Sequence, residues 1–391
     1  MTLQELMTRW NGYQIEMRRW FHQHPEESTK EVRTAERIRA ELARAGIPWR
    51  PCGLGTGTLA RIVGAQPGRT ILLRGDIDAL SVNEETGLPY ASEVPGVMHA
   101  CGHDCHISML LTAAMIVNEI RDRLKGTIVF AFQPAEELGL GARAMIEEGA
   151  LEGVDACFGM HVWSDYPAGT VALRKGPMMA SGDQFKIHVR GKSTHGAQPQ
   201  LGADALIMGA AIAQNLQTIV SRETYPGDTA VVTVGKFHSG TRFNVVAGTA
   251  ELEGTTRTFS PAVRDRFEEQ ITRIARSTAE AMRGTADVEY LRIVPVTVND
   301  PGMIDVVTGA AGKIFGDKGV IEADLQMGGE DFAFYQEKVP GAMVLLGVRN
   351  EACDAVWPQH HGCYKVDESV LVKGAALHVQ TALDFLGVDL Q

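Results

Sequence analysis

The chain lacks the long apolar run that a membrane span or an export signal requires. No segment approaches the roughly 20 uncharged apolar residues of a transmembrane helix. The N-terminal stretch MTLQELMTRWNGYQIEMRRW contains no apolar core of signal-peptide length, so we expect a cytoplasmic protein. Positive charge is also scarce, because 37 Lys and Arg stand against 48 Asp and Glu, for a net charge of −11. This acidity argues against nucleic acid or an anionic membrane as a partner, since both need a basic surface.

Cysteine is scarce as well. The six Cys lie at positions 52, 101, 105, 157, 353 and 363, with no spacing that would indicate a disulfide framework. In a reducing compartment these thiols stay free. The exception to this thin scatter is HACGHDCH at 99–106, which holds two of the 6 Cys and three of the 12 His. A disulfide, a thiol nucleophile, a metal site and chance are the possible explanations.

The first part of the chain alternates between helical and strand-like segments. Residues 2–46 have helical periodicity up to Gly46, and strands are expected at 57–63, 70–80, 126–134 and 156–163. A helix is expected from about 105 to 124, with Asp104 as a possible cap. This order predicts an α/β domain with a mostly parallel sheet flanked by helices. Polar clusters at 76–78, 99–106, 136–137 and 161 follow or close strands, which predicts one shared site.

The pattern changes near residue 178. Alternating strands and two helices follow in the order β-α-β-β-α-β up to about 295, which predicts a ferredoxin-like α+β insertion. The α/β pattern then resumes and ends in a helix over about 368–386. The predicted domains are therefore a metal-binding catalytic domain, 1–177 and 296–391, and an inserted domain, 178–295.

The cluster at 99–106 has the chemistry of a transition-metal site. Cys and His suit Zn²⁺ and its neighbours better than Mg²⁺ or Ca²⁺, and Cys101 and His103 can point the same way from an extended loop. A structural zinc site would need a second Cys/His pair at similar spacing, and none is present. The remaining possible donors are scattered, as is typical of a catalytic centre assembled from several loops. They are Glu137, His161 and either His360 or His361.

The adjacent pair Glu136–Glu137 suggests a division of labour. Neighbouring side chains diverge, so one carboxylate can bind metal while the other takes a proton from an attacking water. Two metal ions about 3.5–4 Å apart would act on both the water and the scissile carbonyl oxygen.

Seven motifs, taken in order, resemble those of the metallopeptidase-like amidohydrolases of the aminoacylase and carboxypeptidase-G type. Within that family, the resemblance is to the branch of hippurate hydrolases, N-acyl-amino-acid amidohydrolases and auxin-conjugate hydrolases. It covers nearly the whole chain, including RRWFHQHPE near the N-terminus. The motifs are RGDIDAL, HACGHDCH, FQPAEE, GMHVW, GKSTHGAQP, FNVVAGTAELEGTTRTF and MGGEDFAFY.

The resemblance implies an α/β catalytic domain, an inserted dimerisation (lid) domain and two divalent metal ions per subunit, either Zn, Mn, Co or Ni. It implies Glu136 as general base toward a metal-bridged water. His195 would be the lid histidine that reaches the partner subunit's site and steadies the oxyanion. The implied metal ligands are Cys101, His103, Glu137, His161 and His360. His360 is preferred to His361 because it lies four positions before Tyr364.

Three further residues receive roles in the same way. Asn244 and Arg257 lie in motifs that would hold the substrate, and Asp78 would orient a ligand imidazole. The implied reaction is hydrolysis of the amide bond of N-acyl amino acids by a homo-oligomer, a dimer or a dimer of dimers. The alternative is a metal-dependent dipeptidase or aminopeptidase. Both take small molecules as substrates.

The chain departs from the family pattern at three positions. Ser81 replaces the usual Pro after the RGDIDAL motif, Gln200 replaces a common second His, and Ala247 replaces a usual Pro. None of these changes removes a metal ligand or the base, but each affects what can be inferred about substrate preference.

Other interpretations remain open from sequence alone. Cys101 could act as a nucleophile with a nearby His as base, or the protein could bind metal without catalysis. Cys105 and Cys157 are assigned to packing. The remaining candidates are residues expected as hydrogen-bonded neighbours of the site, His99 and His106, and residues that either bind at the site or cap a helix, Glu330 and Asp331.

Overall fold

The computed structural model describes residues 2–390 and divides into two compact units. The first unit comprises Met1–Gly176, Val298–Asp324 and Asp331–Gln391, and the second comprises Pro177–Thr297 and Leu325–Glu330. Residues 325–330 thus pack with the second unit, whereas the sequence placed them in the catalytic domain. None of the helices within 2–390 is long and apolar enough to cross a membrane.

The first unit is built on an eight-stranded sheet with the order β1-β2-β4-β3-β5-β16-β6-β15. Its central run β4-β3-β5-β16 is parallel, which confirms the predicted mostly parallel sheet. The centre of β3 is the apolar run Ile71–Leu73, fully buried as a central parallel strand must be. The strands are β1 (Trp49–Pro51), β2 (Thr58–Val63), β3 (Gln66–Asp76), β4 (Lys125–Gln133), β5 (Ala156–Pro167), β6 (Val171–Leu173), β15 (Val320–Glu322) and β16 (Gly341–Arg349).

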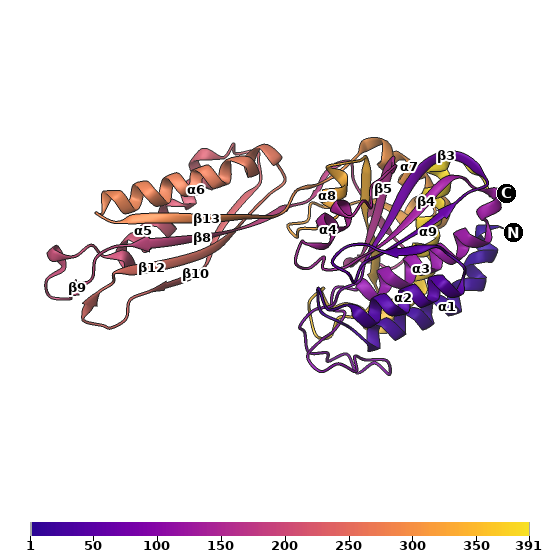
Figure 1. The fold of residues 1–391 in the computed structure, drawn as a ribbon, viewed down its shortest axis with the longest axis horizontal. Helices are drawn as coiled ribbons and strands as arrows, with labels where there is room; N and C mark the ends of the chain where they lie inside the picture. The colour runs from indigo at the N-terminus through magenta and orange to yellow at the C-terminus, as the bar shows by residue number, and fades with distance from the viewer. Residues whose placement is uncertain (1, 391) are drawn as a thin grey trace. The chain divides into compact units, whose positions relative to one another are not determined.

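Helices flank this sheet (Figure 1). Helices α3 and α9 contact β3, β4 and β5, and α1 and α7 pack against them, while α4 and α8 contact each other and the strands β4 and β16. Nearly all of α3 is buried, so its side chains form the centre of the main hydrophobic core. The helices are α1 (Leu3–Gln23), α2 (Val32–Arg44), α3 (His103–Glu119), α4 (Gly141–Glu147), α7 (Pro301–Phe315), α8 (Ala333–Gln336) and α9 (Leu371–Leu386).

Three local expectations for this unit are wrong. The helical region 2–46 is two helices separated by residues 24–31, because Pro25 cannot continue α1 and biases the residue before it toward extended backbone. The strand expected over 70–80 is β3, which ends at Asp76. Helix α3 begins at His103 behind Gly102, whose φ of 87° is left-handed, and it ends at Glu119. Asp104 does not cap it, and instead its carboxylate pairs with Arg18 at 3.0 Å.

The second unit has a four-stranded antiparallel sheet with the order β10-β12-β8-β13. Its chain order β8-α5-β10-β12-α6-β13 is the predicted β-α-β-β-α-β, so the ferredoxin-like insertion is confirmed. Phe185 and Ile187 of β8 pack with Phe267 and Ile271 of α6 in a core of its own. The elements are β8 (Ser181–Arg190), α5 (Ala205–Asn215), β10 (Ala230–Ser239), β12 (Thr249–Thr258), α6 (Pro261–Ala281) and β13 (Thr285–Val294).

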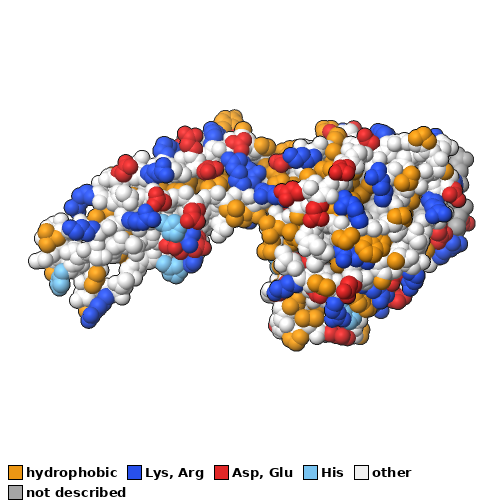
Figure 2. All heavy atoms as spheres, viewed as in Figure 1, with side chains coloured by type: hydrophobic (Ala, Val, Ile, Leu, Met, Phe, Trp, Pro, Cys, Tyr) orange, Lys and Arg blue, Asp and Glu red, His pale blue; other side chains and the backbone are white. Residues whose placement is uncertain are grey.

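Four shorter strands complete the structure. The pair β9 (Thr194–His195) and β11 (Val245–Val246) extends from the second unit, while β7 (Gly176–Met179) and β14 (Thr297–Asn299) lie where the chain passes from one unit to the other. Acidic and basic side chains are interspersed over both units on the face drawn in Figure 2.

Candidate metal centre

The candidate ligands come from chain segments that follow or close the central parallel strands. Glu137 follows β4, His161 lies within β5, and His360 lies in the loop after β16. Cys101 and His103 stand where the chain after β3 enters α3. Because the carboxyl ends of parallel strands share one edge of a sheet, residues far apart in sequence meet there.

Measured distances show that the five residues form one cluster. The Cys101 sulfur lies 3.4 Å from His161 Nε2 and 3.3 Å from His360 Nε2. Glu137 Oε1 lies 3.5 Å from His360 Nε2 and 3.9 Å from His103 Nε2. One donor atom each from Cys101, His103 and Glu137 lies within 4.8 Å of the others. All five sequence-predicted ligands are therefore in one place.

The imidazoles are oriented so that one nitrogen faces this cluster. His103 Nδ1 bonds Asp78 Oδ1 at 3.2 Å, and His161 Nδ1 donates to the Val162 carbonyl at 2.7 Å. A partner on Nδ1 fixes the tautomer that presents Nε2 as a lone-pair donor, as in metal-bound histidines. Asp78 is itself held by the Ser28 hydroxyl at 2.6 Å. This geometry matches the orienting role expected of Asp78.

Two buried atoms of the cluster that could bind a metal ion have no hydrogen-bond partner among the described residues. They are His103 Nε2 and Glu137 Oε1. Buried polar atoms are almost always paired, so two orphans beside a cysteine sulfur need a further group. A borderline-soft divalent cation accepts this mixture of sulfur, nitrogen and oxygen donors. The residues present thus fit a transition-metal ion.

His360 and His361 have different surroundings. The backbone N–H of His360 donates to the Ala100 carbonyl at 2.8 Å, its φ of 64° is left-handed, and its Nε2 lies 3.3 Å from the Cys101 sulfur. His361 stacks on Trp357 at 4.6 Å, and its Nδ1 accepts the N–H of Cys363 at 3.0 Å. The structure therefore joins His360, and not His361, to the cluster.

Electrostatics at the cluster also favour a cation. Burial and the carboxylates of Glu137 and Glu136 raise the pKa of the Cys101 thiol well above its ordinary range. Burial opposes protonation of His103, but Asp76 and Asp78 together raise its pKa to about 10. Without a cation the thiol stays protonated at neutral pH, so Cys101 is a poor nucleophile by itself. A bound divalent ion would replace these protons and stabilise the thiolate.

Neighbouring histidines do not offer donors in the same way. His106 bonds Asp76 through Nδ1 and accepts the Val162 N–H at Nε2 over 2.9 Å, so both nitrogens are engaged, as expected. His99 was expected to be hydrogen-bonded, but both its ring nitrogens are buried without a partner among the described residues. Burial lowers its pKa to about 4, so it is a neutral core residue. Cys105 and Cys157 are fully buried packing residues, as predicted.

Sequence reasoning missed a buried arginine behind the site. Arg74 donates to Asp76 at 2.6 Å and to Asp331 at 2.9 Å, and all three side chains are fully buried. Asp331 Oδ2 also accepts the N–H of Ala142 at 3.1 Å in the first turn of α4. A carboxylate oxygen of Glu136 lies within 4.8 Å of one of Asp331. The available signal was an arginine within the otherwise apolar strand TILLRGD.

The other three candidate residues lie in the second unit. His195 is exposed on β9, opposite Val245 on β11, and its Nδ1 accepts the Ala197 N–H at 3.1 Å. Asn244 is close by, since its carbonyl accepts the Gly196 N–H at 2.8 Å, and its Oδ1 is buried without a partner among residues 2–390. The side chain of Arg257, on β12, packs against Gly182. A Cβ atom added to Gly182 would lie 2.1 Å from Arg257 Nη1. His195 and Asn244 therefore form a pair, and Arg257 lies on a separate element.

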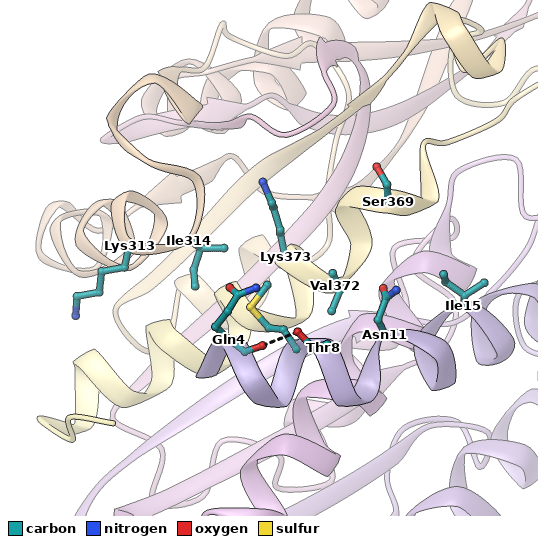
Figure 3. Close-up of a pocket in the computed structure, with 10 residues that line it drawn as sticks. Gln4, Thr8, Asn11, Ile15, Lys313, Ile314, Ser369, Val372 and Lys373 are labelled. Atoms are coloured by element: carbon teal, nitrogen blue, oxygen red, sulfur yellow. Dashed lines mark hydrogen bonds between the residues drawn. The ribbon is translucent and has the colours of Figure 1, made fainter. Parts of the chain in front are cut away.

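A cavity in the first unit lies elsewhere. It has a volume of about 500 Å³ and lies among α1, α7 and α9, lined in part by Gln4, Asn11 and Lys373 (Figure 3). None of the candidate site residues lines it.

Comparison with known proteins gives the family. The model of peptidase family M20/M25/M40 matches residues 72–384, so the chain belongs to this family and is a hydrolase of amide bonds. The N-acetyl-L-cysteine deacetylase of Bacillus subtilis is 41% identical over 94% of this chain and 87% of its own. Thermostable carboxypeptidase 1 of Saccharolobus solfataricus is 39% identical over 95% of both. The resemblance seen in the sequence is confirmed.

A solved structure agrees with the fold. The Bacillus subtilis YXEP protein, described as a dinuclear metal-binding peptidase from the M20 family, is 36% identical with a TM-score of 0.86. The alignment covers 98% of this chain and 100% of that one.

Proposed function

We propose that this protein hydrolyses the amide bond of N-acyl amino acids, using two divalent metal ions held by the first unit. The observation that supports this most strongly is the pair of orphaned buried donors, His103 Nε2 and Glu137 Oε1, beside the Cys101 sulfur. The donor set fits Zn²⁺, Mn²⁺, Co²⁺ or Ni²⁺, and it does not discriminate among them.

The donors fall into two groups that share one atom. Cys101, His103 and Glu137 form the first group, and the Cys101 sulfur is also within 3.4 Å of His161 Nε2 and 3.3 Å of His360 Nε2. The Cys101 thiolate would therefore help to hold the ions, together with donors from both groups. The dinuclear description of the YXEP protein supports this count.

Glu136 carries the proton in this proposal. When bound, the two ions would polarise the scissile carbonyl and lower the pKa of a water molecule. Glu136 adjoins the ligand Glu137, yet its own carboxylate lies by Asp331. It takes a proton from the attacking water and delivers it to the amide nitrogen as the C–N bond breaks. The products are a carboxylate and a free amino acid.

The proposed substrate class follows from what two relatives have in common. A deacetylase of an N-acetyl amino acid and a carboxypeptidase both release an amino acid whose α-carboxylate is free. A guanidinium is suited to such a carboxylate, and burial lowers the pKa of Arg257 without neutralising it. We assign Arg257 and Asn244 to substrate binding. His195 is assigned to the oxyanion in a partner subunit's site, so the enzyme acts as a homo-oligomer.

The alternative substrate is a free dipeptide, which the likeness to the YXEP protein, a peptidase, favours. A dipeptide needs a carboxylate to hold its α-ammonium group. Asp331 is not suited to this task, because its oxygens already accept from Arg74, Gln133 and the Ala142 N–H. The likeness to an N-acetyl-L-cysteine deacetylase leads us to rank the acylated substrate above the dipeptide.

The test is a substrate panel with and without metal. The purified protein is stripped with a chelator, then assayed against acetyl, benzoyl and longer-chain acyl amino acids and against free dipeptides. Added Mn²⁺, Co²⁺, Ni²⁺ or Zn²⁺ should restore cleavage of at least one acyl class. Full turnover in the stripped protein would refute the metal mechanism, and cleavage confined to dipeptides would refute the substrate class.

A further inference from the structure

The loop after β4 carries the proposed base, Glu136. Carboxylates from other segments accept hydrogen bonds from the backbone N–H groups of the residues before and after Glu136. Glu31 Oε1 accepts the backbone N–H of Ala135 at 2.9 Å, and Asp78 Oδ2 accepts the backbone N–H of Glu137 at 3.1 Å. Both acceptors are buried carboxylates from distant parts of the chain. Charged acceptors make stronger hydrogen bonds to backbone N–H groups than neutral ones do.

The hydrogen bond to Ala135 is important because the backbone of this residue is strained. Its φ of 50° is left-handed, a conformation that the Cβ of an L-residue disfavours. Strained backbone persists only where the surroundings over-determine it, and it collects at functional sites. The residue that follows is Glu136, so the strain at Ala135 sets the direction in which the base leaves the strand.

The Glu31 side chain does not cap its own helix and is available to other segments. It stands at the N-cap of α2 but makes no capping bond there. Glu26 supplies the cap instead, accepting the N–H of Thr34 at 2.8 Å. Glu31 Oε1 also accepts the N–H of Thr29 at 2.9 Å, and its Oε2 accepts the Thr56 hydroxyl at 2.9 Å.

We propose that Glu31 is a positioning residue for catalysis. Its hydrogen bond to Ala135 holds the left-handed turn, and this turn orients Glu136 toward the substrate and Glu137 toward the other four metal ligands. This inference rests on the proposed function, because it takes Glu136 as the base. It predicts that loss of Glu31 lowers kcat more than it changes KM, since the substrate contacts are elsewhere.

The first experiment compares Glu31→Ala and Glu31→Gln with the control Glu41→Ala. Glu41 is a buried carboxylate within α2, and its partners are Tyr13 at 3.2 Å, Arg37 at 3.1 Å and Arg44, all outside the loop. Glu31→Ala should lower kcat about 10–100-fold with KM changed less than threefold, as for other residues that support a metal ligand. Glu31→Gln keeps a side-chain oxygen that can accept the Ala135 N–H, so its kcat should be close to that of the wild type. Glu41→Ala should cost stability without changing kcat.

A second variant tests the turn itself. Glycine adopts a left-handed φ without the Cβ penalty, so Ala135→Gly in the Glu31→Ala background should restore part of kcat. A folded Glu31→Ala enzyme with wild-type kcat would overturn the proposal. So would a loss of kcat that neither Glu31→Gln nor Ala135→Gly relieves, because the effect would then be general destabilisation.

The affinity for Co²⁺ provides a readout that does not depend on the substrate. The thiolate-to-cobalt absorption band reports binding at Cys101 directly. Glu31→Ala should weaken Co²⁺ binding about 10–100-fold through displacement of Glu137, and Glu41→Ala should leave it unchanged. If the wild-type enzyme cleaved no acyl amino acid, this titration would still decide the role of Glu31. Equal affinity in Glu31→Ala and wild type would count against it.

Discussion

The two units present their candidate residues in different ways. In the first unit, donors from four separate segments converge, and His103 and His161 are buried with one ring nitrogen fixed by protein contacts. In the second unit, His195 is exposed on a strand of two residues. Of the other candidate residues, Asn244 lies near it, because the Asn244 carbonyl accepts the N–H of Gly196.

The difference indicates a division of work. The first unit by itself brings together a complete set of metal donors, so metal binding should depend on its residues alone. The second unit carries the residues that we propose to contact substrate, and no group of three metal donors lies wholly within its described residues. Variants in the two units should therefore have separable effects on metal content and on turnover.

The largest expected effect comes from the base. Glu136→Gln keeps the size and removes the proton acceptor, so kcat should fall by about 10²–10⁴-fold. The number of metal ions bound, measured by elemental analysis, should stay at the wild-type value. A variant that retains full turnover would show that Glu136 is not the base, and loss of metal would show that it is a ligand.

The next effect should come from the second unit. His195→Ala should lower kcat by about 10²–10³-fold if this residue steadies the oxyanion. Because the metal donors belong to the first unit, metal content should be unchanged. If instead His195→Ala lost metal, the separation between the two units would be refuted.

A smaller effect is expected from the orienting carboxylate. Asp78→Asn weakens the bonds that Asp78 accepts from His103 Nδ1 and from the Glu137 N–H, so metal affinity should fall about 10–100-fold. Competition with a chelator of known affinity measures this change. Ser28→Ala, which removes one bond to Asp78, is the matched control and should have a weaker effect in the same direction.

The smallest effect concerns acid stability of the first unit. Burial lowers the pKa of His378 on α9 to about 3, against about 6.5 for an unfolded histidine. The unfolded state therefore binds more protons below pH 6.5, and stability falls as the pH drops from there toward 3. Between pH 7 and pH 5 this histidine should cost about 2 kcal/mol of the free energy of unfolding.

His378→Leu should remove that share of the pH dependence. All 5 Trp of the chain lie in segments of the first unit, so tryptophan fluorescence during denaturation reports this unit alone. An identical pH dependence in variant and wild type would show that His378 is accessible to protons in the folded state.

Much of this architecture could be predicted from the sequence, because its signals are local. Alternating strands and two helices define the second unit, and HACGHDCH with the Glu136–Glu137 pair contains three of the five proposed metal donors. The motif around Tyr364 was enough to prefer His360 to His361, although only the fold shows that His361 stacks on Trp357.

What could not be predicted depends on contacts between distant residues. Glu31 and Ala135 are 104 positions apart, and Arg74 and Asp331 are 257 apart. A charged residue in a helix or strand has the same sequence signal whether it is solvated or buried against a partner. For the same reason His99 was expected to have a hydrogen bond, and Asp104 was expected to cap a helix.

The most direct test of the central account is turnover measured against the number of metal ions bound per chain. Stripped protein is titrated with Mn²⁺ or Co²⁺, bound metal is counted by equilibrium dialysis, and hydrolysis of an N-acyl amino acid is followed in the same samples. The account predicts that turnover is absent without metal and reaches its maximum at two ions per chain, with Cys101→Ala binding neither ion tightly. Full turnover at zero bound ions would contradict it.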